Sequence, residues 1–85
     1  MNWKVIIDPS VNKRLKKIPK NDAERILKAA IEFGNDPFVG DIDKMEGADD
    51  SWRRRIGDYR IFYWLNTKNK VVYVFDLKRR TTTTY

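Results

Sequence analysis

Residues 51–63, with the sequence SWRRRIGDYRIFY, constrain the fold more than any other part of the chain. The first half of this segment alternates apolar and basic residues, and the second half is rich in aromatic and β-branched residues, so two β-strands are predicted. Gly57 and Asp58 between them predict a tight turn, and a two-residue loop fixes the register of a hairpin. We therefore expect an antiparallel hairpin in which Ile56 faces Tyr59.

This register places Arg55 directly opposite Arg60. Because side chains alternate across a strand, Arg53, Arg55 and Arg60 then share one face. Arg54 is the charged exception on the other face. The apolar side chains of that other face are Trp52, Ile56, Tyr59, Ile61 and Tyr63. A like-charge pair across a hairpin lowers stability by on the order of 0.2–1 kcal/mol. Either the arginine face is open to water, which screens the repulsion, or it binds a polyanion.

The absence of cysteine and histidine excludes several classes of site. No disulfide and no thiolate zinc site can form, and the commonest metal ligand and general base is missing. We therefore expect no metal or other cofactor. A chain of 85 residues suits one domain that spans residues 1–85. No apolar run approaches the ~18 residues of a membrane span, so we expect a cytoplasmic protein with no membrane partner.

The positive charge is concentrated in the second half of the chain. Residues 1–50 carry 9 Lys or Arg and 10 Asp or Glu, whereas residues 51–85 carry 9 Lys or Arg against only Asp58 and Asp76. The formal net charge of +6 therefore arises in the part that also holds most of the aromatic residues. A basic surface with interleaved aromatic residues is typical of nucleic-acid binding.

The N-terminal part predicts a strand followed by two helices. Residues 3–7 are almost wholly apolar, which predicts a strand covered on both faces. Asp8 and Pro9 predict the start of a helix, with Asp8 as its N-cap, and Pro19 predicts its end. The apolar stripe of this helix is Val11, Leu15 and Ile18. The basic residues of segment 13–20 form either its solvated side or a second nucleic-acid patch.

A second helix is predicted to begin at Asn21, because Glu24 three residues later completes a capping-box pattern. Gly34 is expected just after its C-terminal end. The apolar positions with helical spacing are Ala23, Ile26, Leu27, Ala30 and Ile31.

Residues 35–51 are predicted to be the least regular segment, with a short strand around Lys44 and Met45. Its acidic side chains suggest either a solvated loop or a metal site. They include Asp41, Asp43, Glu46, Asp49 and Asp50. Their spacing does not match the calcium-loop pattern, because the fifth position counted from Asp41 is Met45 and the twelfth is Trp52. A solvated acidic loop is the favoured interpretation.

Residues 71–77 predict a last strand because they are strongly β-forming. If Leu65 faces Val71, Asp76 faces Arg60 and could hold the guanidinium in position. The same register pairs Ile61 with Phe75 and Tyr63 with Tyr73.

These elements predict an α+β fold: an N-terminal strand, a helical hairpin, and then a three- to four-stranded antiparallel sheet. We expect the helices to cover the face that holds Ile56, Ile61, Tyr63 and Phe75. The arginine face is then left open. Phe62 and Trp64 would lie beside the arginines, on a surface suited to stacking bases and neutralising phosphates.

The chain resembles the RelE/ParE toxin superfamily over essentially its whole length. The resemblance rests on the order of elements, Met45-Glu46-Gly47, the segment WRRRIGDYRIFY, and a last strand that ends in Lys-Arg-Arg before a late tyrosine. It implies the toxin of a type II toxin–antitoxin pair, neutralised by a small antitoxin that wraps around it. RelE-like members cut mRNA in the ribosomal A site, and ParE-like members inhibit DNA gyrase.

The resemblance also implies a set of site residues. Those that match the catalytic pattern of the family are Arg53, Arg55, Arg60, Arg79 or Arg80, and Tyr85. They would orient the scissile phosphate, stabilise its charge, and stack or activate the nucleotide, with the RNA 2′-hydroxyl as nucleophile and a cyclic phosphate as product. Arg54, Phe62 and Lys78 are the further residues that we expect to bind RNA.

One position departs from the best-known pattern, in which the first hairpin strand carries lysine. Arginine, with a pKa above ~12, cannot act as a general base. The other candidates for the base are Glu46, Tyr85, Asp76 and Lys78. Either catalysis rests on positioning and electrostatics, or the chain is not a nuclease.

We predict a RelE-like, ribosome-dependent mRNA interferase, that is, an endoribonuclease that arrests translation. A ParE-like gyrase inhibitor and a non-catalytic RNA-binding module are the alternatives. The expected partners are a cognate antitoxin with an acidic toxin-binding segment, mRNA in the ribosomal A site, and the surrounding rRNA.

Overall fold

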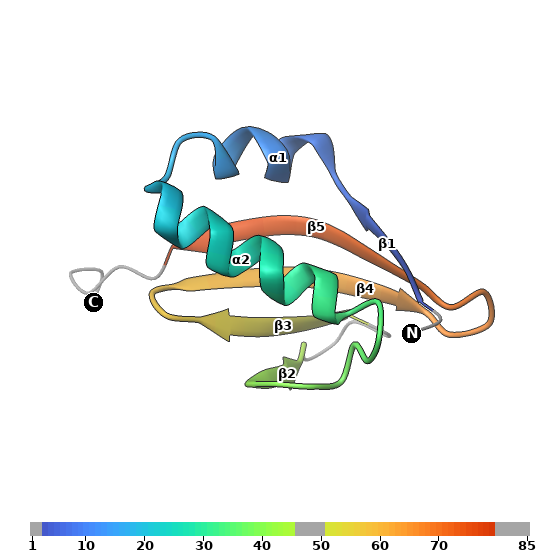
Figure 1. Cartoon of the computed structure of the whole chain (residues 1–85). Coiled ribbons are helices and arrows are strands. Elements are labelled where there is room, and N and C mark those ends of the chain that lie inside the picture. Colours follow the sequence, from blue (N-terminus) through green and yellow to red (C-terminus); the bar gives the residue numbers. More distant parts are fainter. Residues whose placement is uncertain (1–2, 46–50, 80–85) are drawn as a thin grey trace.

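The computed structural model describes residues 3–45 and 51–79. Its elements, in chain order, are β1 (Lys4–Ile7), α1 (Pro9–Leu15), α2 (Lys20–Glu32), β2 (Ile42–Lys44), β3 (Ser51–Ile56), β4 (Tyr59–Asn66) and β5 (Val71–Arg79). The strands form one sheet in the order β1-β5-β4-β3-β2 (Figure 1). β1 runs parallel to β5, and the other neighbouring strands are antiparallel. The predicted α+β fold class is confirmed.

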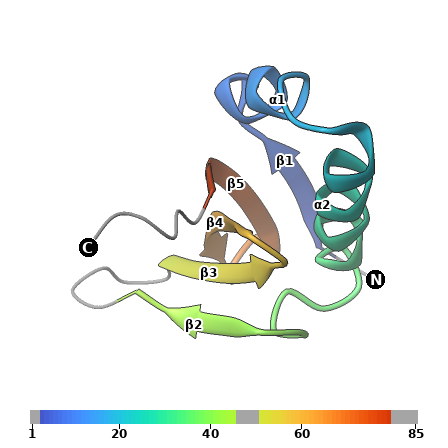
Figure 2. The ribbon, with the colours of Figure 1, turned by 90° about the vertical axis from the view of Figure 1, so that its left-hand side faces the viewer.

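Both helices pack against the same face of the sheet, as the two ribbon views show (Figures 1 and 2). The buried residues of this layer are Val11, Leu15, Ile26, Phe33, Tyr59, Ile61, Tyr63, Leu65, Val72, Val74 and Leu77. The rings of Phe33 and Tyr63 lie with their centroids 4.2 Å apart. The Tyr63 hydroxyl donates a hydrogen bond to the carbonyl of Pro37 at 2.8 Å, and burial raises the pKa of Tyr63. Neither described helix is long and apolar enough to cross a membrane.

The start of α1 is confirmed, because the Asp8 side chain accepts a hydrogen bond from the backbone N–H of Ser10 and Pro9 is the first helical residue. The predicted end at Pro19 is wrong, since α1 already ends at Leu15. The predicted cap of α2 is also wrong: Pro19 occupies the N-cap position with φ −55° and ψ 142° and makes no side-chain cap hydrogen bond. Its fixed φ, combined with an extended ψ, supplies the non-helical conformation that an N-cap needs. Gly34 follows the C-cap residue Phe33, as expected.

The central hairpin has the predicted register. Arg55 pairs with Arg60 and Ile56 with Tyr59. Gly57 in the turn has φ +57°, a left-handed conformation that glycine adopts without steric cost. β2 forms one to two residues earlier than expected and pairs with β3 at the edge of the sheet.

The predicted register between β4 and β5 is wrong. Leu65 pairs with Val72 rather than Val71, and a bulge shifts the ladder further, so that Arg60 pairs with Lys78 rather than Asp76. Residues 71–75 are all apolar, so a period-two pattern could not fix the register. The one-residue change of register also moves Phe75 out of the predicted helix-covered set, and its ring lies 6.3 Å from that of Phe62 on the other face.

Candidate functional site

The face of the sheet opposite the helices, here called the open face, carries most of the predicted site. Residues that pair across neighbouring strands point to the same face, so the side chains form rows across the sheet. The row nearest the hairpin turn is Arg55, Arg60 and Lys78. The next row is Asp43, Arg53, Phe62 and Asp76. The third row is Ser51, Trp64, Tyr73 and Ile6.

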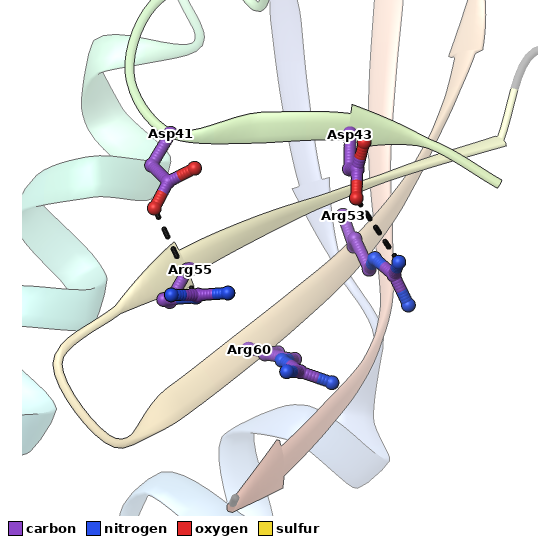
Figure 3. Close-up of a pocket in the computed structure, with 5 residues that line it drawn as sticks. All are labelled: Asp41, Asp43, Arg53, Arg55 and Arg60. Atoms are coloured by element: carbon purple, nitrogen blue, oxygen red, sulfur yellow. Dashed lines mark hydrogen bonds and ion pairs between the residues drawn. The ribbon is translucent and has the colours of Figure 1, made fainter.

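The first two rows enclose a small hollow of about 40 Å³, here called the basic pocket (Figure 3). Its lining residues are Asp41, Asp43, Arg53, Arg55 and Arg60. The three arginines come from the adjacent strands β3 and β4, and the two carboxylates reach over them from β2 and the residue before it (Figure 3). The predicted grouping of the three arginines on one open face is confirmed.

Two of these guanidinium groups are partly neutralised by the aspartates. Arg53 Nη2 lies 3.0 Å from Asp43 Oδ2, and Arg55 Nε lies 3.8 Å from Asp41 Oδ2. Both pairs are well exposed, so each stabilises the fold by at most about 1 kcal/mol. Among the described residues, Arg60 has no ion-pair partner. The pocket therefore offers one unneutralised guanidinium beside two that an anion could share.

Asp76 does not hold Arg60 in position, which corrects the expectation from the sequence. Its carboxylate lies 3.0 Å from Arg14 Nη1 of α1 and 3.9 Å from Lys78 Nζ. Arg14 also donates a hydrogen bond to the backbone carbonyl of Leu77. The cause is the one-residue change of register together with the bulge, which places Asp76 opposite Phe62 instead of Arg60.

Arg54 lies on the helix-covered side, as the hairpin register predicts, and therefore away from the surface where it was expected to bind RNA. Its Nη2 is 3.1 Å from Glu32 Oε1 of α2, and its guanidinium carbon is 5.7 Å from the ring centroid of Phe33. Only 15 % of its side chain is exposed. It therefore adds no charge to the open face and instead links β3 to α2.

Phe62 is on the open face, as expected, but only 9 % of it is exposed. The Phe75 ring lies on one side of it, and the Nζ of Lys78 is 5.5 Å from its ring centroid. Lys78 itself is well exposed on the open face. Phe62 is therefore a support for Lys78 rather than an accessible stacking surface.

Arg79 pairs with Tyr59, so its side chain lies on the face opposite the basic pocket, and its guanidinium carbon is 5.8 Å from the Tyr59 ring centroid. Burial raises the pKa of the Tyr59 hydroxyl, which donates a hydrogen bond to Asp22 at 3.3 Å. Arg80 and Tyr85, the other expected C-terminal site residues, lie outside the described residues, as does Glu46.

Asp41 and Asp43 also line the site, although they were expected only in a solvated acidic loop. Asp41 and Asp43 flank Ile42, and this alternation of polar and apolar residues is the sequence pattern that predicts an edge strand with both carboxylates on one face. In the described part of the chain, no three acidic side chains converge in a way that could hold a metal ion. Asp49 and Asp50 lie outside that part.

The chain thus combines two helices on one face of a mixed five-stranded sheet with an arginine-lined pocket on the other. A sequence profile of the family described as ParE toxin of type II toxin-antitoxin system, parDE, matches residues 5–83. A comparison with curated protein sequences found no match. The chain belongs to the ParE/RelE toxin family of type II toxin–antitoxin systems.

Solved structures agree with this assignment. A chain of the archaeal RelE–RelB complex from Pyrococcus horikoshii OT3 is 34% identical, with a TM-score of 0.87 over 98% of this chain and 100% of that one. The isolated Escherichia coli RelE toxin shares the fold, with 19% identity and a TM-score of 0.80 over 95% of this chain and 87% of that one. The YoeB/ParE toxin from Agrobacterium tumefaciens does so with 15% identity and a TM-score of 0.75 over 93% and 100%.

Proposed function

We propose that this toxin is a RelE-like mRNA interferase that cleaves mRNA in the ribosomal A site. The observation that carries the proposal is the basic pocket, in which Arg53, Arg55 and Arg60 converge from two adjacent strands. The planar guanidinium fork binds phosphate oxygens bidentately, and three such groups suit a phosphodiester that gains negative charge during cleavage. A protein-binding surface alone would not require this convergence.

The arginines would bind the scissile phosphate and align it for attack by the neighbouring 2′-hydroxyl. We expect Arg60 to contribute most. Among the described residues it has no carboxylate partner that the phosphate would have to displace. The reaction forms a bond from the 2′-oxygen to phosphorus and breaks the bond from phosphorus to the 5′-oxygen. It leaves a cyclic phosphate and a 5′-hydroxyl, whose proton comes from water. Arginine cannot take the proton. Among the described pocket residues, only Asp41 and Asp43 can accept one.

The test adds the purified toxin to translating ribosomes and maps the 5′ ends of the mRNA. We expect new ends with the wild type and a loss of about 100-fold or more in cleavage with Arg60→Ala, which removes a charge-stabilising donor. Arg25→Ala is the matched control, because Arg25 is an exposed arginine on α2, on the other side of the sheet. Intact mRNA with folded wild-type toxin would refute the proposal.

Gyrase inhibition is the second candidate, because the matching family profile is described by its ParE members. In that case the basic pocket would contact protein. A supercoiling assay separates the two functions: under our proposal, gyrase remains active at toxin concentrations that cut mRNA. Stalled supercoiling with intact mRNA would instead favour gyrase inhibition as the function.

We also propose that a small antitoxin with an acidic binding segment neutralises the toxin. Relatives have been crystallised as RelE–RelB complexes, and the second half of this chain is strongly basic. Co-expression with the product of a short neighbouring gene should restore growth. Continued arrest would exclude that gene product as the antitoxin.

A further inference from the structure

The third row of the open face contains two exposed apolar side chains, although it lies directly beside the row that holds Arg53. Its largest member is Trp64, of which 44 % is exposed, and Ile6 at the far edge is 38 % exposed. The other exposed large apolar side chains of the described residues are Leu27 and Ile31 on α2 and Phe38 and Val39 in the loop after it, and none of them lies on the open face. An exposed tryptophan beside a charged pocket marks a contact surface.

The Trp64 ring is held in a fixed orientation. It meets the Tyr73 ring edge to face, with centroids 6.4 Å apart and an interplanar angle of 89°. The Tyr73 hydroxyl in turn donates a hydrogen bond to the carboxylate of Asp8 at the start of α1. On its other side, Trp64 pairs with the short side chain of Ser51, which is too small to cover an indole. The ring is thus supported from one side and remains accessible.

Trp64 is also placed in line with the pocket. Arg60, Phe62 and Trp64 alternate along β4 and share the open face, so Trp64 lies about 14 Å from Arg60 along the strand. Arg53 is its diagonal neighbour on β3, through the pairs Arg53–Phe62 and Ser51–Trp64. Because Phe62 is covered, Trp64 is the accessible aromatic face next to the arginines in the described part of the sheet.

We propose that Trp64 stacks on an unpaired base of the same RNA strand whose phosphate lies in the basic pocket. This inference rests on the proposed function, since it takes RNA as the ligand. Single-stranded RNA is bound by combining a positive groove for the backbone with aromatic side chains for the bases, and the two lie side by side here. The charge complementarity of the adjoining arginines favours RNA over an apolar protein segment.

The test uses intrinsic tryptophan fluorescence and a short single-stranded RNA that carries 2′-O-methyl groups, which prevents cleavage. Stacking of a base on Trp64 should quench its emission. Trp64→Ala should weaken RNA binding by roughly 5- to 150-fold. Trp64→Phe should keep most of the affinity and lose the quenching, because phenylalanine still stacks and does not contribute indole emission.

Trp3 and Trp52 provide matched controls within the same chain. Both lie beside the Phe38 ring, at centroid distances of 6.3 and 5.5 Å, away from the open face. Trp52→Phe should therefore retain the quenching. Thermal unfolding of each variant checks that the fold is intact, and Trp64→Phe keeps the test decisive if Trp64→Ala is unstable.

The outcomes separate this inference from the proposed function. Unchanged RNA affinity in folded Trp64→Ala, quenching that persists in Trp64→Phe, or no RNA binding by the wild type would each overturn it. If Trp64→Ala loses antitoxin binding while its RNA affinity is unchanged, the inference is also overturned, and the third row contacts protein rather than RNA. Wild-type toxin that shows Trp64-dependent quenching but cuts no mRNA on ribosomes would support stacking and refute the nuclease proposal.

Discussion

Arg53 donates a hydrogen bond across the sheet to Asp43, with 3.0 Å between Nη2 and Oδ2. The two residues pair on β3 and β2, so the carboxylate is held above the same face as the three arginines. One nitrogen of the guanidinium is engaged, and the others can still donate to a phosphate. The pair therefore fixes Arg53 while it lowers the positive charge of the basic pocket.

Asp43→Asn should bind RNA more tightly than the wild type. The amide oxygen can still accept the hydrogen bond from Arg53, but a negative charge leaves the pocket. Because the pair is exposed, we expect a gain of up to about fivefold. Anisotropy with a 2′-O-methylated RNA at low salt measures it. Asp58→Asn, which removes an exposed charge in the hairpin turn, is the matched control, and an equal gain there would show that only net charge matters.

Arg54→Ala should destabilise the fold by roughly 1–3 kcal/mol while leaving RNA affinity unchanged. The side chain is largely buried between β3 and α2, where it pairs with Glu32 and covers Phe33. Arg54→Met should cost less, because it keeps the apolar stem and removes Nε and Nη1, which are buried without a hydrogen-bond partner. Urea unfolding gives the stabilities. Weaker RNA binding by Arg54→Ala would contradict its placement away from the open face.

Gly40→Ala should also destabilise the fold, by about 1–3 kcal/mol. Gly40 has φ +98°, and a Cβ there would lie 2.7 Å from Arg54 Nε. The effect has two parts, strain of the backbone and a clash with the guanidinium. In an Arg54→Ala background the clash is absent, so the same substitution should cost less. If the losses of stability are strictly additive in a double-mutant cycle, the Arg54 guanidinium does not contribute to the cost of Gly40→Ala.

The arginine face could be predicted because it depends only on residues that are close together in the sequence. The two-residue turn at Gly57 and Asp58 sets the register of β3 against β4, and that register alone places Arg53, Arg55 and Arg60 together. Nothing outside the hairpin is needed. The start of α1 was predictable for the same reason, since Asp8 caps a helix that begins at the next residue.

The features that were not predictable depend on partners far away in the sequence. The change of register and the bulge that separate Asp76 from Arg60 bury Val72, Val74 and Leu77 under the helices. The apolar run 71–75 does not show in advance which of its residues are buried. In the sequence, Arg54 is a charged residue on an otherwise apolar face. Only the structure shows that Glu32 of α2 pairs with it. Tertiary packing decides both.

Asp8 is expected to make the stability of the fold depend on pH in the acid range. Hydrogen bonds from the Ser10 hydroxyl, the Tyr73 hydroxyl and the Ser10 N–H lower the pKa of the Asp8 carboxyl in the folded state. In the unfolded chain the carboxyl has its ordinary pKa of about 3.9, so the unfolded state binds the proton first as the pH falls. The contribution of Asp8 to stability is therefore complete above about pH 4 and is lost as the pH falls through the folded pKa.

Asp8→Asn isolates this contribution, because asparagine can still cap α1 but does not titrate. Urea unfolding between about pH 6 and about pH 3 should show that the stability advantage of the wild type over Asp8→Asn shrinks towards acid pH. Tyr73→Phe, which removes one of the hydrogen bonds, should show a smaller acid-dependent loss than the wild type. If wild type and Asp8→Asn lose stability in parallel across this range, Asp8 does not contribute to the acid dependence.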